Sequence, residues 1–161
     1  SRILTALEKI TQELPVVFPV HPRTRKTIAA LGLSERVAAM KNLRVIDPLG
    51  YLDFLALYSK ARLVLTDSGG IQEETTALGI PCLTLRENTE RPITVEMGTN
   101  VVVGTDAGRI VSAASVALNG AAQKQRKQPP LWDGHTSERI LDVLEEITPR
   151  ESCQESSQES S

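Results

Sequence analysis

Aromatic side chains are scarce in this chain, where phenylalanine, tyrosine and tryptophan together make up 3% of 161 residues. Proteins that bind single-stranded nucleic acid stack the bases on aromatic side chains, so the scarcity argues against that function. The net charge of −2 argues the same way, because nucleic acids and anionic membranes attract surfaces rich in Lys and Arg. We therefore expect neither a nucleic acid nor a membrane as a partner.

Long apolar runs and cysteines are also few. No apolar run approaches the roughly 20 residues that a membrane-spanning helix requires. Cys82 lies in a short apolar run and Cys153 in a polar tail, a placement that suggests neither a disulfide nor a metal site nor a nucleophile. The cysteine pattern predicts a reducing, cytoplasmic setting. The remaining composition, 40% apolar and 24% charged, is ordinary for a globular domain.

Short apolar runs alternate with segments of helical spacing along most of the chain. We predict strands over residues 15–20, 43–46, 63–66, 81–85 and 100–103. We predict helices over residues 3–14, 23–31, 51–59, 69–78, 106–118 and 137–147. The last of these helices should turn Ile140, Leu141 and Leu144 inward. The alternation predicts an α/β fold in which a parallel sheet carries helices on both faces.

The two ends of the sequence depart from this pattern. The chain starts in a helical pattern without an initiating Met, so we interpret it as a fragment of a longer protein. From Glu151 onward the sequence repeats QESS and is almost without apolar residues. Such a segment cannot bury enough surface to offset the entropy of ordering it. We therefore predict one domain over residues 1–147 and a disordered tail over residues 148–161.

The most informative segment is TDSGGIQEE at residues 66–74, which joins the third predicted strand to a helix. At Ser68, Gly69 and Gly70 the turn can present unpaired backbone N–H groups and the positive end of a helix dipole to an anion. The same pattern also fits a plain strand-to-helix turn in which Ser68 caps the helix. Glu74 should face the turn, where it could accept two hydrogen bonds from a ribose. We interpret Glu73 as an acid favoured by the helix dipole.

Further polar residues follow the predicted strands, where parallel sheets bind ligands: His21, Asp47, Asp67, Arg86 and Gly104. In the loop 86–92, either Arg86 or Arg91 could bind a diphosphate through a charge-assisted fork, or both could form exposed ion pairs. His21 could bind an anion or simply close its strand with a hydrogen bond. Phe54 could stack on a base or belong to the core.

Taken together, these segments resemble the non-hydrolysing UDP-N-acetylglucosamine 2-epimerases. The resemblance runs from about residue 1 to residue 147. It rests on several motifs in the right order and at the right spacing: PVHP at 19–22, DPLGYL at 47–52, TDSGGIQEE at 66–74, GIP at 79–81, LR at 85–86, TERP at 89–92, GTN at 98–100 and VG at 103–104.

The resemblance implies a GT-B architecture, in which two Rossmann-like domains close on a nucleotide sugar and this chain is the carboxyl-terminal half. It implies that Ser68, Gly69 and Gly70 bind the diphosphate of UDP and that Glu74 binds the ribose hydroxyls. It also places Arg91 near the phosphates.

Three further positions take their expected roles from the resemblance alone. Phe54 would border the uracil. Leu49 would lie beside the base where the family usually has Gln, so a backbone contact there would survive and a side-chain contact would be lost. His21 resembles a histidine of a second, allosteric UDP-sugar site in bacterial members.

The resemblance implies a reaction that interconverts UDP-GlcNAc and UDP-ManNAc by elimination and re-addition of UDP, without a metal or cofactor. The family has its acid–base carboxylates in the amino-terminal domain, so we expect no catalytic residue in this chain and no activity from it alone. The full protein would bind UDP-N-acetylhexosamine as a homodimer. Two alternatives remain open, the half of a GT-B glycosyltransferase and a non-catalytic UDP-sugar-binding paralogue.

Overall fold

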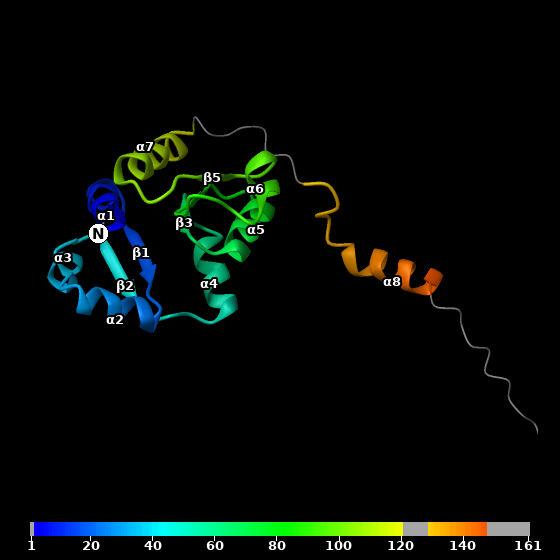
Figure 1. Ribbon diagram of the computed structural model, residues 1–161, viewed down its shortest axis with the longest axis horizontal. Helices are drawn as coiled ribbons and strands as arrows, with labels where there is room; N and C mark the ends of the chain where they lie inside the picture. Colours follow the sequence, from blue (N-terminus) through cyan, green and yellow to red (C-terminus); the bar gives the residue numbers. More distant parts are fainter. Residues whose placement is uncertain (1, 121–128, 148–161) are drawn as a thin grey trace, which may run out of the picture. The chain divides into compact units, whose positions relative to one another are not determined.

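The computed structural model describes residues 2–120 and 129–147, and its contacts divide the chain into two compact units, Ser1–Pro129 and Pro130–Ser161. The described strands of the first unit are β1 Val16–Pro19, β2 Leu43–Ile46, β3 Val64–Thr66, β4 Cys82–Thr84 and β5 Asn100–Val102 (Figure 1). Its described helices are α1 Arg2–Glu13, α2 Pro22–Ala30, α3 Ser34–Ala38, α4 Tyr51–Tyr58, α5 Gly69–Leu78, α6 Pro92–Glu96 and α7 Ala107–Leu118. The second unit contains α8 Thr136–Ile147.

Every strand pair that the structure describes is parallel. Strand β1 pairs with β2, Val16 opposite Leu43. Strand β4 lies between β3 and β5, with Cys82 opposite both Val64 and Asn100. The predicted α/β fold class is thus confirmed, although hydrogen bonding groups the described strands into one sheet of two and one of three.

The central strand β4 is buried on both faces, as the prediction of helices on either side requires. Leu83 belongs to a core cluster that includes Ile10 of α1 and Ile110 of α7. Successive side chains of a strand point to opposite faces, so Cys82 and Thr84 face away from that cluster. On their side the strand contacts α5, and all three β4 residues are buried. The carboxyl end of β4 therefore opens between two helical layers.

The predicted strands and long helices lie within one or two residues of their observed bounds, but α3 and α6 were not predicted. Each spans five residues, which is too short for a helical period to become visible. The predicted end of α5 is confirmed, because Gly79 takes a left-handed conformation with φ 68°. In that conformation its N–H reaches carbonyls of the last helical turn.

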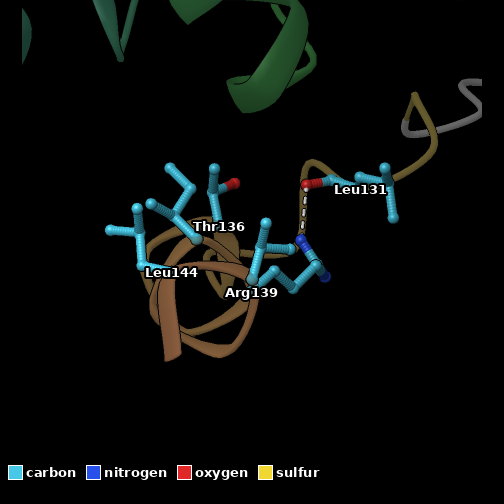
Figure 2. Close-up of a pocket in the computed structure, with 6 residues that line it drawn as sticks. Leu131, Thr136, Arg139 and Leu144 are labelled. Atoms are coloured by element: carbon cyan, nitrogen blue, oxygen red, sulfur yellow. Dashed lines mark hydrogen bonds between the residues drawn. The ribbon is translucent and has the colours of Figure 1, made fainter. Parts of the chain in front are cut away.

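The described part of the second unit contains the amphipathic helix α8 and the loop before it. The expectation that the apolar side of this helix points inward is wrong within the described residues. Ile140, Leu141 and Leu144 are 54%, 59% and 47% exposed. Figure 2 shows an open pocket on this helix, beside which Arg139 donates a hydrogen bond of 3.4 Å to the carbonyl of Leu131. The predicted tail, residues 148–161, lies outside the described residues.

Candidate functional site

The turn between β3 and α5 presents a helix N-terminus at the carboxyl end of the sheet. Ser68 is the N-cap residue, with an extended backbone, and α5 begins at Gly69. The expectation that the Ser68 hydroxyl caps the helix is wrong, because this side chain makes no capping hydrogen bond. The backbone N–H of Ser68 donates to Thr66 Oγ1 at 3.0 Å, and the residue is exposed.

The two glycines of the turn leave the first N–H groups of α5 uncovered. Neither Gly69 nor Gly70 has a positive φ, so the conformational freedom of glycine is not what the turn requires. A Cβ at Gly69 would come no closer than 3.8 Å to Arg91 Cγ, and one at Gly70 would lie 4.0 Å from Ser68 Oγ. Because a methyl group would fit at both positions, the glycines are not needed to avoid a clash. Their lack of a side chain instead leaves the backbone N–H groups accessible to a ligand. Open N–H groups at a helix N-terminus attract anions.

Arg91 is the arginine that lies at this turn. Its Nε is 2.7 Å from Glu73 Oε1, and both side chains are about two-fifths exposed. Arg86 instead pairs with Glu90 over 3.4 Å at the surface. The structure thus has Arg91, the arginine that the resemblance favoured, beside the turn and has Arg86 in a separate surface ion pair. It also shows that Glu73 is paired with Arg91, a contact that the helix-dipole interpretation of this acid did not include.

Glu74 contacts helix α4, whereas its neighbour Glu73 pairs with Arg91 at the turn. The expectation that Glu74 faces the turn stays a prediction. Glu74 Oε2 accepts a hydrogen bond from the hydroxyl of Tyr58. Tyr58 is only 4% exposed, and its ring packs edge-on against Phe54 with the ring centroids 5.1 Å apart. Burial, together with the hydrogen bond and charge of Glu74, raises the pKa of Tyr58, so the phenol remains a donor. Sequence reasoning missed Tyr58, although a buried tyrosine always needs a partner for its hydroxyl.

A buried hydrogen-bond network ties the loop of Arg91 to helix α5. Gln72 Oε1 accepts from Thr89 Oγ1 at 2.5 Å and from Asn100 Nδ2 at 3.1 Å. Thr89 Oγ1 in turn accepts from the backbone N–H of Arg91 at 3.0 Å. Gln72 is 1% exposed, so these bonds are shielded from water. The network therefore fixes the backbone of Arg91, whose side chain lies beside Gly69.

The same network continues into the sheet through Asn100. Its amide oxygen accepts from Thr84 at 2.6 Å, and its amide nitrogen also donates to Thr94 at 3.0 Å. Gly98 packs tightly beside this network. A Cβ there would lie 2.5 Å from the Thr76 side chain and from the Thr94 carbonyl. The GTN motif thus has a packing role, with glycine for space and asparagine for the network.

The remaining predicted positions lie at the carboxyl ends of β1 and β2. His21 is exposed and caps α2, its Nδ1 accepting from the Arg23 N–H at 3.2 Å. This hydrogen bond caps the following helix, whereas the sequence analysis allowed one that closes the preceding strand. Leu49, 39% exposed, lies in the loop between β2 and α4. Asp47 forms an exposed ion pair of 2.7 Å with Arg25.

The described residues contain neither a reactive cysteine nor a group of side chains that could bind a metal. Cys82 is fully buried, and burial raises the pKa of its thiol to about 11. A neutral, inaccessible thiol is not a nucleophile, as the sequence predicted. In the part of the chain that the structure covers, no three His, Cys, Asp or Glu side chains gather in an arrangement that could hold a metal. None of the described helices has the length and apolarity to cross a membrane.

The sequence comparison identifies the family of this chain. Residues 1–145 match the family model described as UDP-N-acetylglucosamine 2-epimerase. The chain belongs to this family. The epimerase of Methanocaldococcus jannaschii is 43% identical over 129 residues, which are 80% of this chain and 34% of the relative.

Solved structures of this epimerase family support the same assignment. The M. jannaschii enzyme in complex with UDP-GlcNAc and UDP is 40% identical and has a TM-score of 0.78. The match covers 89% of this chain and 39% of that enzyme. The chain thus spans about two-fifths of the length of its epimerase relatives or less, and it matches their GT-B fold over most of its residues.

The family also includes epimerases of a more modified sugar. UDP-2,3-diacetamido-2,3-dideoxy-D-glucuronate 2-epimerase of Pseudomonas aeruginosa is 40% identical over 148 residues, which are 91% of this chain and 40% of the relative. This identity is close to that with the UDP-N-acetylglucosamine enzymes. Similarity over this stretch of the epimerases therefore does not distinguish one sugar from the other.

Proposed function

We propose that this chain is the UDP-binding half of a UDP-N-acetylglucosamine 2-epimerase. The observation that carries the proposal is the presence of three groups along the first two turns of α5. Ser68, Gly69 and Gly70 form an open helix N-terminus, Arg91 lies beside it, and Glu74 follows one turn later. This set suits a nucleoside diphosphate, which combines two phosphates with a ribose diol.

The proposed diphosphate contacts also suit the chemistry of a leaving group. In the epimerase reaction, UDP leaves C1 as a proton leaves C2, and UDP then adds back after the proton returns to the other face. Negative charge grows on the diphosphate as the C1–O bond breaks. The α5 N-terminus and Arg91 would stabilise that charge, and preorganised donors of this kind contribute roughly 3–4 kcal/mol each.

Proton removal at C2 requires a base that we assign to another part of the enzyme. The two acids in the first turns of α5 are already engaged, Glu73 by Arg91 and Glu74 by Tyr58. Since the relatives are about two and a half times as long as their match to this chain, they have ample length for a second domain. We propose that the 161-residue chain binds UDP and does not epimerise UDP-GlcNAc by itself.

Further parts of the proposal concern the base, the sugar and the assembly. Phe54 and Leu49 would border the uracil, and His21 would belong to an allosteric UDP-sugar site. The sugar would be a UDP-2-acetamido sugar, with UDP-GlcNAc favoured by the M. jannaschii complex and the diacetamido-glucuronate by the Pseudomonas relative. The full enzyme would act as a homodimer. The free thiol of Cys82 is compatible with the cytoplasm as its location.

Calorimetric titration of the 161-residue chain with UDP, UMP and uridine tests the proposal. We expect UDP to bind more tightly than UMP by about tenfold or more, because the second phosphate meets the helix N-terminus and Arg91. Uridine should bind weakest. Equal binding of UDP and uridine, or no binding of UDP, would contradict the proposed site. Turnover of UDP-GlcNAc by this chain would contradict the assignment of the base.

A further inference from the structure

Tyr58 occupies an unusual position relative to the proposed UDP site. It lies at the end of α4, and its side chain crosses to α5 to contact Glu74, 16 residues along the chain. Its hydroxyl donates to Oε2 of that acid, which is half-buried. Tyr58 itself is 4% exposed, so a ligand that reached Glu74 would not need to contact the phenol.

The contact restricts a side chain that would otherwise be mobile. A glutamate has three rotatable bonds, and a half-buried one can point its carboxylate in several directions. Tyr58 has a rigid ring that is held from the side by Phe54, at an interplanar angle of 74°. The phenol therefore acts as a fixed donor, and a fixed donor on Oε2 orients the whole carboxylate plane.

The contact also leaves acceptor capacity for a ligand. An ionised carboxylate has about four lone-pair sites on two oxygens, and one hydrogen bond from Tyr58 occupies one of them. Oε1 and the second lone pair of Oε2 could still accept from two neighbouring hydroxyls. A ribose presents such a pair at C2′ and C3′.

We propose that Tyr58 is a positioning residue that holds the Glu74 carboxylate in the orientation that accepts the ribose hydroxyls of UDP. The inference rests on the proposed UDP site. It adds a residue outside the turn, on a different helix, to the determinants of nucleotide affinity. Phe54 then has two roles, since the ring proposed to border the base also supports the tyrosine.

The variant Tyr58→Phe removes the hydroxyl and keeps the ring with its packing against Phe54, so the fold is retained. The chain offers a matched control in Tyr51→Phe, because Tyr51 lies on the same helix and is 64% exposed. The two ligands are UDP and 2′,3′-dideoxyuridine 5′-diphosphate, which keeps the base and both phosphates and lacks the ribose hydroxyls. Titration calorimetry measures each variant with each ligand, and thermal unfolding verifies folding.

We expect Tyr58→Phe to weaken UDP by about three- to tenfold, the loss associated with one well-oriented hydrogen bond to a charged group. The dideoxy analogue should bind Tyr58→Phe and the unchanged chain equally, and Tyr51→Phe should affect neither ligand. In the background of Glu74→Gln, the Tyr58→Phe effect should fall to roughly a third or less of its value, because the two residues act through one contact.

Three results would overturn the inference, and they differ from one another. Equal weakening of both ligands by Tyr58→Phe would mean that the tyrosine supports the fold and does not orient Glu74 toward a ribose. An unchanged affinity for UDP would mean that Glu74 needs no positioning. If the unchanged chain bound UDP and the dideoxy analogue equally, or bound neither, the proposed function or its ribose contact would fail first, and the inference with it.

Discussion

Arg91 and Glu73 form an ion pair of 2.7 Å that joins the loop after β4 to the first turns of α5. The pair lies beside Gly69, where a ligand anion would meet the helix N-terminus. Its neighbour Glu74 points instead to Tyr58. The two adjacent acids thus differ in their contacts, since Glu73 partly neutralises Arg91 and Glu74, which we propose binds the ribose, contacts Tyr58.

This difference predicts unequal effects of removing the two acids. Glu74→Ala should weaken UDP by about 1.5–3 kcal/mol, the usual contribution of hydrogen bonds to a charged group. Glu73→Ala should change the affinity by less than about 1 kcal/mol, because the pair is exposed to solvent, and any change should be a gain. Titration calorimetry with UDP measures both. Equal losses would show that the acids have no such division of roles.

The open backbone at Gly69 predicts a variant that is more stable and binds less well. Gly69→Ala places a methyl group where it meets nothing within 3.8 Å, so the helix should gain about 0.5–1 kcal/mol in unfolding free energy. The same methyl group would stand against a phosphate, and UDP affinity should fall by about tenfold or more. Urea unfolding and calorimetry measure the two effects.

Gly98→Ala is the contrasting variant. A Cβ at Gly98 would approach the Thr94 carbonyl to 2.5 Å, so overpacking should destabilise the fold by about 1–3 kcal/mol. A loss of stability in Gly69→Ala comparable to that in Gly98→Ala would contradict the account of the turn.

The buried network predicts that Gln72→Leu destabilises the fold although leucine fills a similar volume. Thr89 and Asn100 would lose their acceptor, and unpaired buried donors cost about 1–3 kcal/mol. UDP affinity should fall as well, because the loop that holds Arg91 would be released. Gln12→Leu, at an exposed position of α1, is the control and should leave the urea midpoint almost unchanged. Equal midpoints for the two variants would argue against the network.

The contact between α1 and α3 predicts part of the response to acid. The guanidinium of Arg36 donates to both oxygens of Glu8, at 2.5 and 2.7 Å, and these hydrogen bonds lower the pKa of Glu8 below 4.5. A carboxyl whose pKa is lowered on folding contributes stability at neutral pH, and this is lost as the pH falls through the folded value.

Glu8→Gln should therefore remove part of the loss of stability on acidification. Urea midpoints measured from neutral pH downward should fall less steeply for Glu8→Gln than for the unchanged chain. Glu13→Gln, on an exposed part of the same helix, is the control and should keep the original slope. Parallel curves for Glu8→Gln and the unchanged chain would show that the pair does not govern the acid response.

Hydrophobic periodicity and turn residues predicted most of the fold, because they act locally along the chain. Residues 43–46 were predicted as a strand and form β2 with those bounds. The helices α3 and α6 could not be predicted in this way, since five residues make little more than one turn. The orientation of Ile140 and Leu144 was wrong for a different reason. Periodicity identifies the apolar side of a helix, but not what covers it.

In the candidate site, too, local features could be predicted and contacts between distant residues could not. The helix that begins after Ser68 followed from local pattern, which a sequence encodes directly. The partners of the acids did not follow, because Arg91 is 18 residues from Glu73 and Tyr58 is 16 residues from Glu74. Contacts across such separations depend on how helices and loops pack. The residues alone did not separate Arg91 from Arg86, and the structure has Arg91 at the turn, as the family resemblance implied.

The network beneath the turn consists of neutral side chains: Gln72, Thr84, Thr89, Thr94 and Asn100. Such hydrogen bonds do not titrate and, being buried, are little affected by dissolved ions. The contacts proposed for the diphosphate are ionic and partly open to solvent, so salt screens them. Rising ionic strength should therefore release the nucleotide without loosening the support beneath it, so that affinity responds to salt while the architecture does not.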